Sequence, residues 1–264
     1  MEFLLFIITM LAVGCGVGIL SAALGIGGGI LMVPAFLTLY PQMDIHTAKG
    51  SSMFIIIFVA TYNALRMNRG DMRNPMKLIN SIAIGSIIGG FIAGWLTAKL
   101  TDAYASWIFI ALLLFAAART FLLKEKEVTE DQVQKRTITA ATIGLLSGIV
   151  AGATGTGGGA VFVPFALMAG IVSNKRVVAL SNAVMAVAAA AGTIAYLTAP
   201  KTTDMDWTIG LTNISLAPFV ILGAVAAAPL GRKLNHHLSF NRRRIVMAFL
   251  LVLITIRLAL RTLA

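Results

Sequence analysis

Long runs of apolar residues, separated by short polar or charged stretches, cover almost the whole chain of 264 residues. A helix rises about 1.5 Å per residue, so about 20 successive apolar residues cross the hydrocarbon core of a membrane. Most of the runs are near that length, and the pattern therefore predicts an all-α polytopic membrane protein. The apolar segments are 3–23, 28–40, 45–66, 76–98 and 104–123, followed by 138–154, 159–172, 176–198, 208–231 and 245–263.

Two of these segments, 28–40 and 159–172, are short, and only a glycine run separates each from the segment before it. The first run is Gly25-Ile26-Gly27-Gly28-Gly29, and the second, 130 residues later, is Gly155-Thr156-Gly157-Gly158-Gly159. At this offset 11 of the 24 positions from 14 to 37 are identical, including the proline five residues after each last glycine. This is an internal repeat. It predicts a first membrane repeat at 1–123, a cytoplasmic linker at 124–136 and a second membrane repeat at 137–264.

Each pair of segments separated by a glycine run can be arranged in the membrane in two ways. If each pair crosses the membrane once, each repeat has four spans and the repeats are parallel. If each pair is a re-entrant helical hairpin, each repeat has three further spans and the repeats are inverted. The basic residues favour the second arrangement, because 16 of the 21 Lys and Arg lie in or beside loop 66–77, the linker, residues 175–176 and loop 231–244. Only inverted repeats place all four regions in the cytoplasm, where short basic loops gather.

Composition supports this assignment and excludes other classes. The chain is 58% hydrophobic and 12% charged, with a mean hydropathy of +0.91. Its net charge of +11 is explained by orientation in a membrane rather than by nucleic-acid binding. One cysteine, Cys15, and no grouping of Cys, His, Asp and Glu within a span indicate no metal site, no cofactor and no enzyme. The expected partners are membrane lipid and a small anion, and a homo-oligomer is open.

The glycine runs are the main candidate for function. Irregular backbone at membrane depth is tolerated where it is buried in protein or lines a cavity. Glycine permits positive φ, and the half-helix that follows begins with unpaired N–H groups at the positive end of its dipole. Two such ends near the membrane midplane form an anion site and are typical of secondary transporters. The alternative is that the glycines only permit close helix packing.

Polar residues open the segment that follows each hairpin. Ser51, Ser52, Ser181 and Asn182 are candidates to donate hydrogen bonds to anion oxygens, and Ser51 matches Ser181 at the 130-residue offset. Lys49 either attracts the anion or extends to water at the outer interface. The predicted substrate-binding residues are Gly25, Gly27, Gly28, Gly29, Lys49, Ser51, Ser52, Gly155, Thr156, Gly157, Gly158, Gly159, Ser181 and Asn182.

These motifs resemble the TauE/SafE family of sulfite and organosulfonate transporters over nearly the whole chain. The resemblance rests on the two glycine runs with Pro34 and Pro164, on Ala48-Lys49-Gly50-Ser51-Ser52 and on Ala179-Leu180-Ser181-Asn182. It implies a transporter of small, commonly sulfur-containing anions in the cytoplasmic membrane. The expected function is therefore secondary transport of sulfite, an organosulfonate or another sulfur oxyanion by alternating access. The alternatives are an anion channel and a transporter of carboxylates or another small anion.

Overall fold

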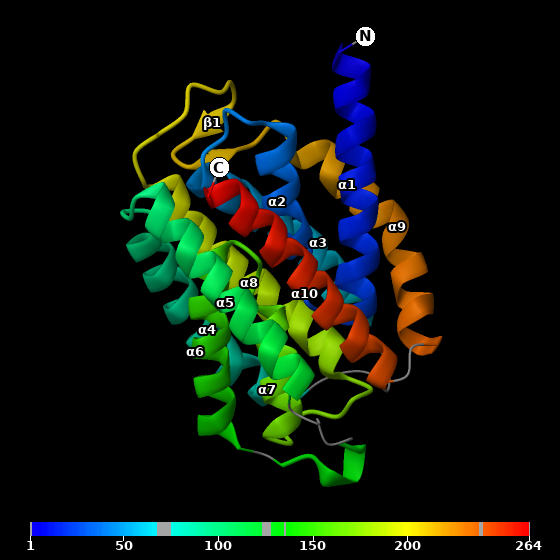
Figure 1. Cartoon of the computed structure of the whole chain (residues 1–264). Helices are drawn as coiled ribbons and strands as arrows, with labels where there is room; N and C mark the ends of the chain where they lie inside the picture. Colours follow the sequence, from blue (N-terminus) through cyan, green and yellow to red (C-terminus); the bar gives the residue numbers. More distant parts are fainter. Residues whose placement is uncertain (1, 68–74, 123–127, 135, 238–239, 264) are drawn as a thin grey trace.

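The protein is a bundle of helices, as the hydrophobic pattern predicts (Figure 1). The structure is a computed structural model that describes residues 2–67, 75–122, 128–134, 136–237 and 240–263. The helices of the first half are α1 (Glu2–Leu24), α2 (Gly29–Leu39), α3 (Ile45–Met67), α4 (Met76–Thr97) and α5 (Asp102–Leu122). Those of the second are α6 (Thr137–Thr154), α7 (Gly159–Met168), α8 (Val177–Leu197), α9 (Ala217–His237) and α10 (Phe240–Leu263), and a 3-10 turn, η2 (Glu130–Gln132), precedes α6.

The helix contacts repeat when the first five helices are exchanged with the last five. Helix α1 packs along α9, and its counterpart α6 packs along α4, while α3 packs against α8 and α5 against α10. Glycines permit these close approaches. A methyl group on Gly18 of α1 would overlap the carbonyl of Ala224 on α9, and one on Gly148 of α6 would overlap the carbonyl of Ser86 on α4. The structural contacts therefore follow the internal repeat of the sequence.

Each glycine run joins two antiparallel helices into a hairpin. Beside the start of α1, the ring of Phe6 lies 6.4 Å from that of Tyr40, which follows the end of α2. In the second half, Gln134 N just before α6 donates to Gly170 O just after α7, at 2.8 Å. In Figure 1 the first hairpin opens toward one end of the molecule and the second toward the other. The inversion of the repeats across a membrane, and its sidedness, stay predictions.

Two ends of the molecule can be defined by their loops. At the β-hairpin end, Thr202 Oγ1 donates to Asp44 at 3.0 Å and His46 Nε2 lies 3.0 Å from Leu100 O. At the linker end, Asn174 Oδ1 accepts a hydrogen bond from Val128 N at 2.7 Å. The two groups of loops lie at opposite ends in Figure 1. Lys77, Arg136 and Arg176, from three of the predicted cytoplasmic regions, line one cavity at the linker end.

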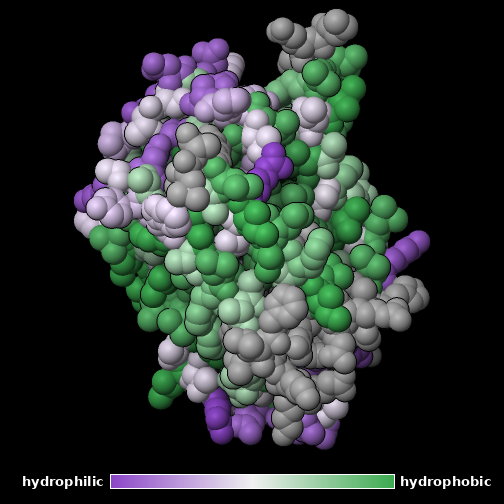
Figure 2. All heavy atoms as spheres, in the orientation of Figure 1, coloured by the Kyte–Doolittle hydropathy of each residue, from purple (hydrophilic) through white to green (hydrophobic). Residues whose placement is uncertain are grey.

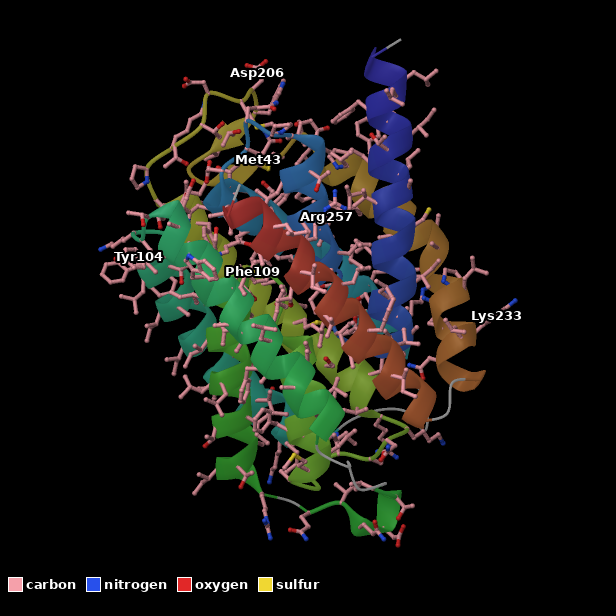
Figure 3. The ribbon with its side chains drawn as sticks, viewed as in Figure 1. Met43, Tyr104, Phe109, Asp206, Lys233 and Arg257 are labelled. Atoms are coloured by element: carbon pink, nitrogen blue, oxygen red, sulfur yellow. The ribbon has the colours of Figure 1, made fainter. Side chains whose placement is uncertain are left out.

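The apolar segment 208–231 does not form a helix along its whole length, so the helix expected there is wrong at its start. Strand β1 (Thr208–Ile209) pairs antiparallel with β2 (Thr212–Asn213), and the helix begins only at Ala217. Gly210, with φ 55°, makes the turn between the strands, and Leu211 N donates to Tyr196 O at 2.9 Å. The backbone of this segment is thus bonded to the end of α8, and Leu211 is buried while Ile209 is exposed. Asp206 lies in the polar loop that leads into this hairpin (Figure 3).

The surface has the distribution that a membrane protein requires. In the described part of the chain, α1, α3, α4, α6, α8 and α9 are long and apolar enough to cross a membrane. Apolar side chains form a broad band around the middle, and polar ones gather at both ends (Figure 2). The band includes exposed Phe91 and Trp95 of α4 and Leu114 of α5. Such residues are stable next to lipid, so the protein is an all-α, multi-pass membrane protein.

Candidate anion-binding site at the two glycine breaks

The two glycine runs end their helices through positive φ angles. Gly25 and Gly27 have φ of 67° and 80°, and Gly155 and Gly157 have φ of 71° and 84°. Residues with a Cβ rarely adopt this conformation, so the glycines are required here for their backbone. The breaks differ at one position: Gly28 has φ −71°, whereas its counterpart Gly158 has φ 77°.

The breaks contact each other in the centre of the protein. A methyl group on Gly29 would overlap the carbonyl oxygen of Gly155 and lie 2.6 Å from Thr156 Cα. In the reciprocal place, a methyl group on Gly159 would overlap the carbonyl oxygen of Gly25. Both breaks are buried from end to end. Two segments 130 residues apart thus form one central unit, as the anion-site hypothesis needs.

Two serines hold this unit together by reciprocal hydrogen bonds. Ser52 Oγ on α3 donates to Gly155 O of the second break at 2.7 Å, and Ser181 Oγ on α8 donates to Gly25 O of the first at 2.5 Å. Both serines are fully buried. Each half of the chain therefore binds the break of the other half. In this conformation their hydroxyl groups donate to protein carbonyls.

The structural counterpart of Ser181 is Ser52, although the 130-residue offset matches Ser51. The second half has one residue fewer between its proline and its serine: 17 positions separate Pro164 from Ser181, and 18 separate Pro34 from Ser52. Ser51 points elsewhere. Its Oγ donates to Thr47 O at 2.6 Å and accepts from Asn213 N at 2.8 Å, so it connects α3 to β2.

The breaks carry backbone donors without acceptors. Among the described residues no acceptor pairs with the N–H groups of Gly27, Gly28 and Gly29, nor with those of Gly157, Gly158 and Gly159. The first hydrogen bonds of the following helices begin two residues later, from Leu31 and from Val161. Buried N–H groups are normally paired, and these stand at the positive ends of α2 and α7. They form a concentrated set of donors for a negatively charged group.

Two apolar side chains now occupy the space beside the breaks. Ile56 Cδ1 lies 2.8 Å from the position of a methyl group on Gly29, and Met185 Sδ lies 2.7 Å from one on Gly159. The 129-residue offset that relates Ser52 to Ser181 also relates Ile56 to Met185. The structure is therefore closed at the breaks. Sequence reasoning missed both residues, because an isoleucine and a methionine in an apolar helix carry no distinguishing signal.

Asn182 lies beside the first break in a polar network with α1 and α3. Its Oδ1 accepts from Ser21 Oγ at 3.0 Å, and its Nδ2 donates to Val178 O at 2.9 Å. Asn63 Nδ2 donates to Ser21 Oγ at 3.2 Å, and Asn63 Oδ1 is buried without a partner among the described residues. Ser21 was not among the predicted site residues. The repeat could not reveal it, because Ala151 stands at the equivalent position.

Thr156 is occupied within its own break. Its hydroxyl lies 2.7 Å from that of Thr154, and Thr156 N donates weakly to Thr154 Oγ1 at 3.3 Å. Its carbonyl faces Gly27 of the other break. In this conformation the threonine shapes the second break and leaves the neighbouring glycine N–H groups as the available donors.

Lys49 does not extend to water, which removes one of the two alternatives for this residue; its role in anion binding stays a prediction. The side chain is fully buried, its Nζ donates to Ala105 O of α5 at 3.0 Å, and it lies 5.7 Å from the ring centroid of Phe109. Figure 3 shows Phe109 on α5. The backbone of Lys49 touches the second break, with Cα 2.7 Å from the position of a methyl group on Gly155. One end of this residue thus contacts the break while its ammonium group lies against α5.

Comparison with known proteins agrees with this architecture. Residues 10–258 match the family model described as sulfite exporter TauE/SafE. The chain is 29% identical over 259 residues to a probable membrane transporter protein of Methanocaldococcus jannaschii, covering 95% of this chain and 94% of that one. It is 28% identical to one of Haemophilus influenzae, with 90% of each chain covered. To the probable membrane transporter protein YdhB of Bacillus subtilis it is 26% identical, covering 88% of this chain and 90% of the relative. With its helices, its paired breaks and these relatives, the chain belongs to the TauE/SafE family and is a multi-pass membrane transporter of that type.

Proposed function

We propose that this protein is a secondary transporter that moves a small anion across the cytoplasmic membrane by alternating access. The anion is sulfite, an organosulfonate or another sulfur oxyanion, and it binds at the N-termini of α2 and α7. The observation that carries the proposal is the set of buried, unpaired N–H groups of Gly27–Gly29 and Gly157–Gly159. These donors come from both halves, and the two breaks that carry them touch each other.

The chemistry of the breaks favours an anion over a cation or a neutral solute. A cation needs carbonyl or carboxylate oxygens, whereas the carbonyls of Gly25 and Gly155 already accept hydrogen bonds from serines. Unpaired N–H groups need an acceptor, and an oxyanion supplies several in a compact volume. The apolar surroundings strengthen these bonds because little water competes for the donors. No charged side chain is required to hold the ligand.

Transport requires the closed breaks to open toward each end in turn. Ile56 and Met185 occupy equivalent places beside the breaks, so movement of either side chain with its helix exposes the donors. The outer pairs α1–α9 and α4–α6 are counterparts. Rocking of one half against the other can therefore open first one side and then the other. At the linker end, the cavity of about 540 Å³ beside Lys77, Arg136 and Arg176 offers a basic approach for the anion.

A binding screen on the purified protein tests the proposal. Thermal unfolding is followed in the presence of sulfite, sulfate, thiosulfate, a sulfonate, a carboxylate and chloride. A ligand that binds only the folded state raises its stability, so the substrate class should raise the melting temperature in a saturable manner. Loss of that shift in Gly158→Ala, with retention in Lys99→Gln at the exposed β-hairpin end, is the expected result. Equal shifts in both variants would remove the site from the breaks.

Transport by proteoliposomes then separates the alternatives. A transporter exchanges labelled anion against unlabelled anion across the membrane, whereas a channel only dissipates the gradient. Counterflow of a sulfur oxyanion supports the proposal. Counterflow of carboxylates alone would keep the mechanism and change the substrate, and passive flux without counterflow would replace the transporter with an anion channel.

A further inference from the structure

Lys49 is an unusual residue at its position in the fold. Its side chain is fully buried, and the partner of its ammonium group is the neutral carbonyl of Ala105 at 3.0 Å. An ammonium group can donate three hydrogen bonds, and burial disfavours its charged form unless a negative group compensates it. A buried lysine whose ammonium group is hydrogen-bonded to a neutral carbonyl is therefore able to lose and regain a proton as its surroundings change.

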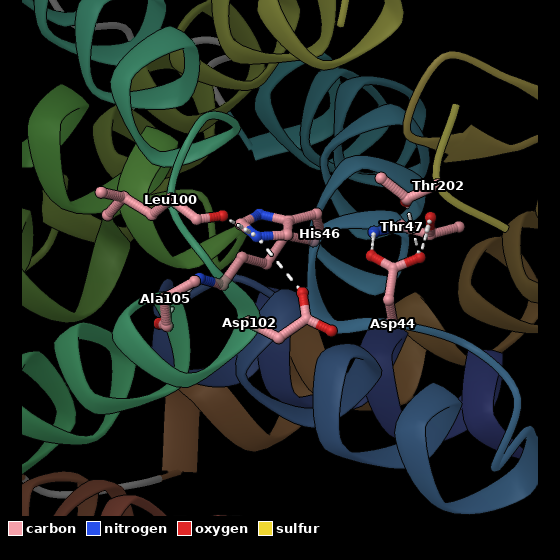
Figure 4. A network of polar contacts seen from close by, with 8 residues as sticks. Asp44, His46, Thr47, Leu100, Asp102, Ala105 and Thr202 are labelled. Atoms are coloured by element: carbon pink, nitrogen blue, oxygen red, sulfur yellow. Dashed lines mark hydrogen bonds and ion pairs between the residues drawn. The ribbon is translucent and has the colours of Figure 1, made fainter. Parts of the chain in front are cut away.

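His46 and Asp102 are ionisable neighbours of Lys49, and Figure 4 shows them with Ala105, whose carbonyl accepts from Lys49. His46 precedes it by three residues on α3, so the two side chains lie on adjacent parts of one helix face. His46 Nε2 lies 3.0 Å from Leu100 O and 3.4 Å from an Asp102 carboxylate oxygen. Asp102 is 60% exposed and His46 only 4%. Nδ1 of His46 is buried and has no hydrogen-bond partner within the described part of the chain.

The other elements around Lys49 contribute little charge. Helices α2 and α8 and strand β2 contain no Asp, Glu, Lys, Arg or His. On α9 the ionisable residues are Arg232, Lys233, His236 and His237, all in its last two turns, and Glu2 is the single acidic residue of α1. Asp44, before α3, is engaged by Thr47 and by Thr202. Among the charged groups, Asp102 therefore acts on Lys49, and Lys49 in turn acts on His46.

We propose that Asp102, His46 and Lys49 form a proton path from the β-hairpin end to the second glycine break, and that Lys49 carries the proton that is transported together with the anion. The inference rests on the proposed function. The protonated Lys49 attracts an anion at the break, against which its own backbone lies. The Asp102 carboxylate takes the proton from water, and His46 passes it to Lys49. When the anion leaves on the opposite side, the ammonium group loses its compensating charge and releases the proton to water there.

Thermodynamic linkage couples the binding of the proton to the binding of the anion. If a protonated Lys49 tightens anion binding, then a bound anion must tighten proton binding by the same factor. Proton and anion therefore bind and leave together, and a proton gradient can drive the anion. The proton is neither created nor consumed in the cycle: it enters at the carboxylate on one side and leaves when Lys49 is next exposed to the other.

The test measures proton movement with anion movement in proteoliposomes that contain a pH-sensitive dye. The probe is a radiolabelled sulfonate, because its own charge does not change near neutral pH. Wild type should take up protons with the sulfonate, and an imposed acid-outside gradient should accelerate uptake. In Lys49→Met, which also loses the attraction for the anion, the number of protons taken up per sulfonate transported should fall to zero. His46→Gln should keep sulfonate counterflow while proton uptake falls to that of protein-free liposomes. Lys99→Met, which removes an exposed lysine stacked on Trp95 at the same end, should leave proton uptake unchanged.

The other outcomes overturn the inference. Wild-type transport without proton movement, or unchanged proton uptake per anion in Lys49→Met, would show that Lys49 carries no coupling proton. Loss of counterflow in folded Lys49→Met and His46→Gln together would place these residues in anion binding instead of coupling. If wild type moves none of the sulfur oxyanions, sulfonates or carboxylates of the screen, the proposed function itself fails, which is distinct from failure of the proton path.

Discussion

The two glycine breaks share a backbone design but differ in the residues that support them. Val178 lies against Gly25 of the first break, and at the equivalent place Lys49 lies against Gly155 of the second. The first break adjoins the amide network of Ser21, Asn63 and Asn182. The second adjoins a buried ammonium group. A duplicated scaffold has thus kept its donors in both halves while the surrounding chemistry diverged.

This difference indicates how the two halves can divide one task. Backbone N–H groups do not depend on side-chain identity, so both breaks retain them as long as their glycines remain. Side chains next to the breaks are free to specialise. The second break, with Lys49 beside it, is the one that responds to protons in our proposal, and the first is held by neutral amides.

The largest expected difference between the halves is in their accessibility from the two sides of the membrane. Gln42 lies just after the first hairpin and Lys175 just after the second, and both are exposed, so each can be replaced by cysteine as a probe (Gln42→Cys and Lys175→Cys). In a Cys15→Ser background, a membrane-impermeant maleimide added to intact cells should label the first and not the second. Labelling of both from the same side would show that the repeats are not inverted.

Substitution of the glycine at which the breaks differ should affect stability next most strongly. Gly158→Ala places alanine at φ 77°, at a cost of about 1–2 kcal/mol. The added methyl group also overlaps the carbonyl of Ser147, which adds about 1–3 kcal/mol. Gly28 has φ −71°, and the three atoms nearest to an added methyl group all belong to the side chain of Val17 rather than to backbone. Thermal unfolding of Gly28→Ala in detergent should therefore show a smaller loss of stability. Equal losses would contradict the observed backbone difference.

Removal of the reciprocal serine bonds should have the smallest effect and be similar in both halves. Ser52→Ala and Ser181→Ala each leave one buried carbonyl without its donor, at a cost of about 1–3 kcal/mol. The melting temperatures of the two variants should fall together. Ser51→Ala serves as the control for register, because its hydroxyl bonds outside the breaks. Ser51→Ala should leave anion binding intact. Loss of anion binding in Ser51→Ala alone would show that Ser51, as the 130-residue offset implies, is the functional counterpart of Ser181.

Local features of the chain were predictable before the structure. The length and spacing of apolar segments determine helices, since each reflects nearby residues and the thickness of a membrane. The runs at Gly25–Gly29 and Gly155–Gly159 similarly predict breaks, because few other residues adopt positive φ. The segment 208–231 shows the limit of such reasoning. Its start is apolar enough for a helix, yet it forms a hairpin whose backbone bonds to the end of α8.

Tertiary structure decided what the breaks contact. The sequence by itself determined a repeated membrane protein with two glycine-broken hairpins, because those features depend on periodicity and on glycine's backbone freedom. It could not determine that Ser52 rather than Ser51 is the structural counterpart of Ser181. The second half has one residue fewer between its proline and its serine, and this difference shifts the equivalence of every residue in the helix that follows. Nor could it determine that Lys49 turns inward to Ala105. The direction of a side chain depends on which helix packs beside it, and that choice is made by the sum of contacts between residues far apart in the chain.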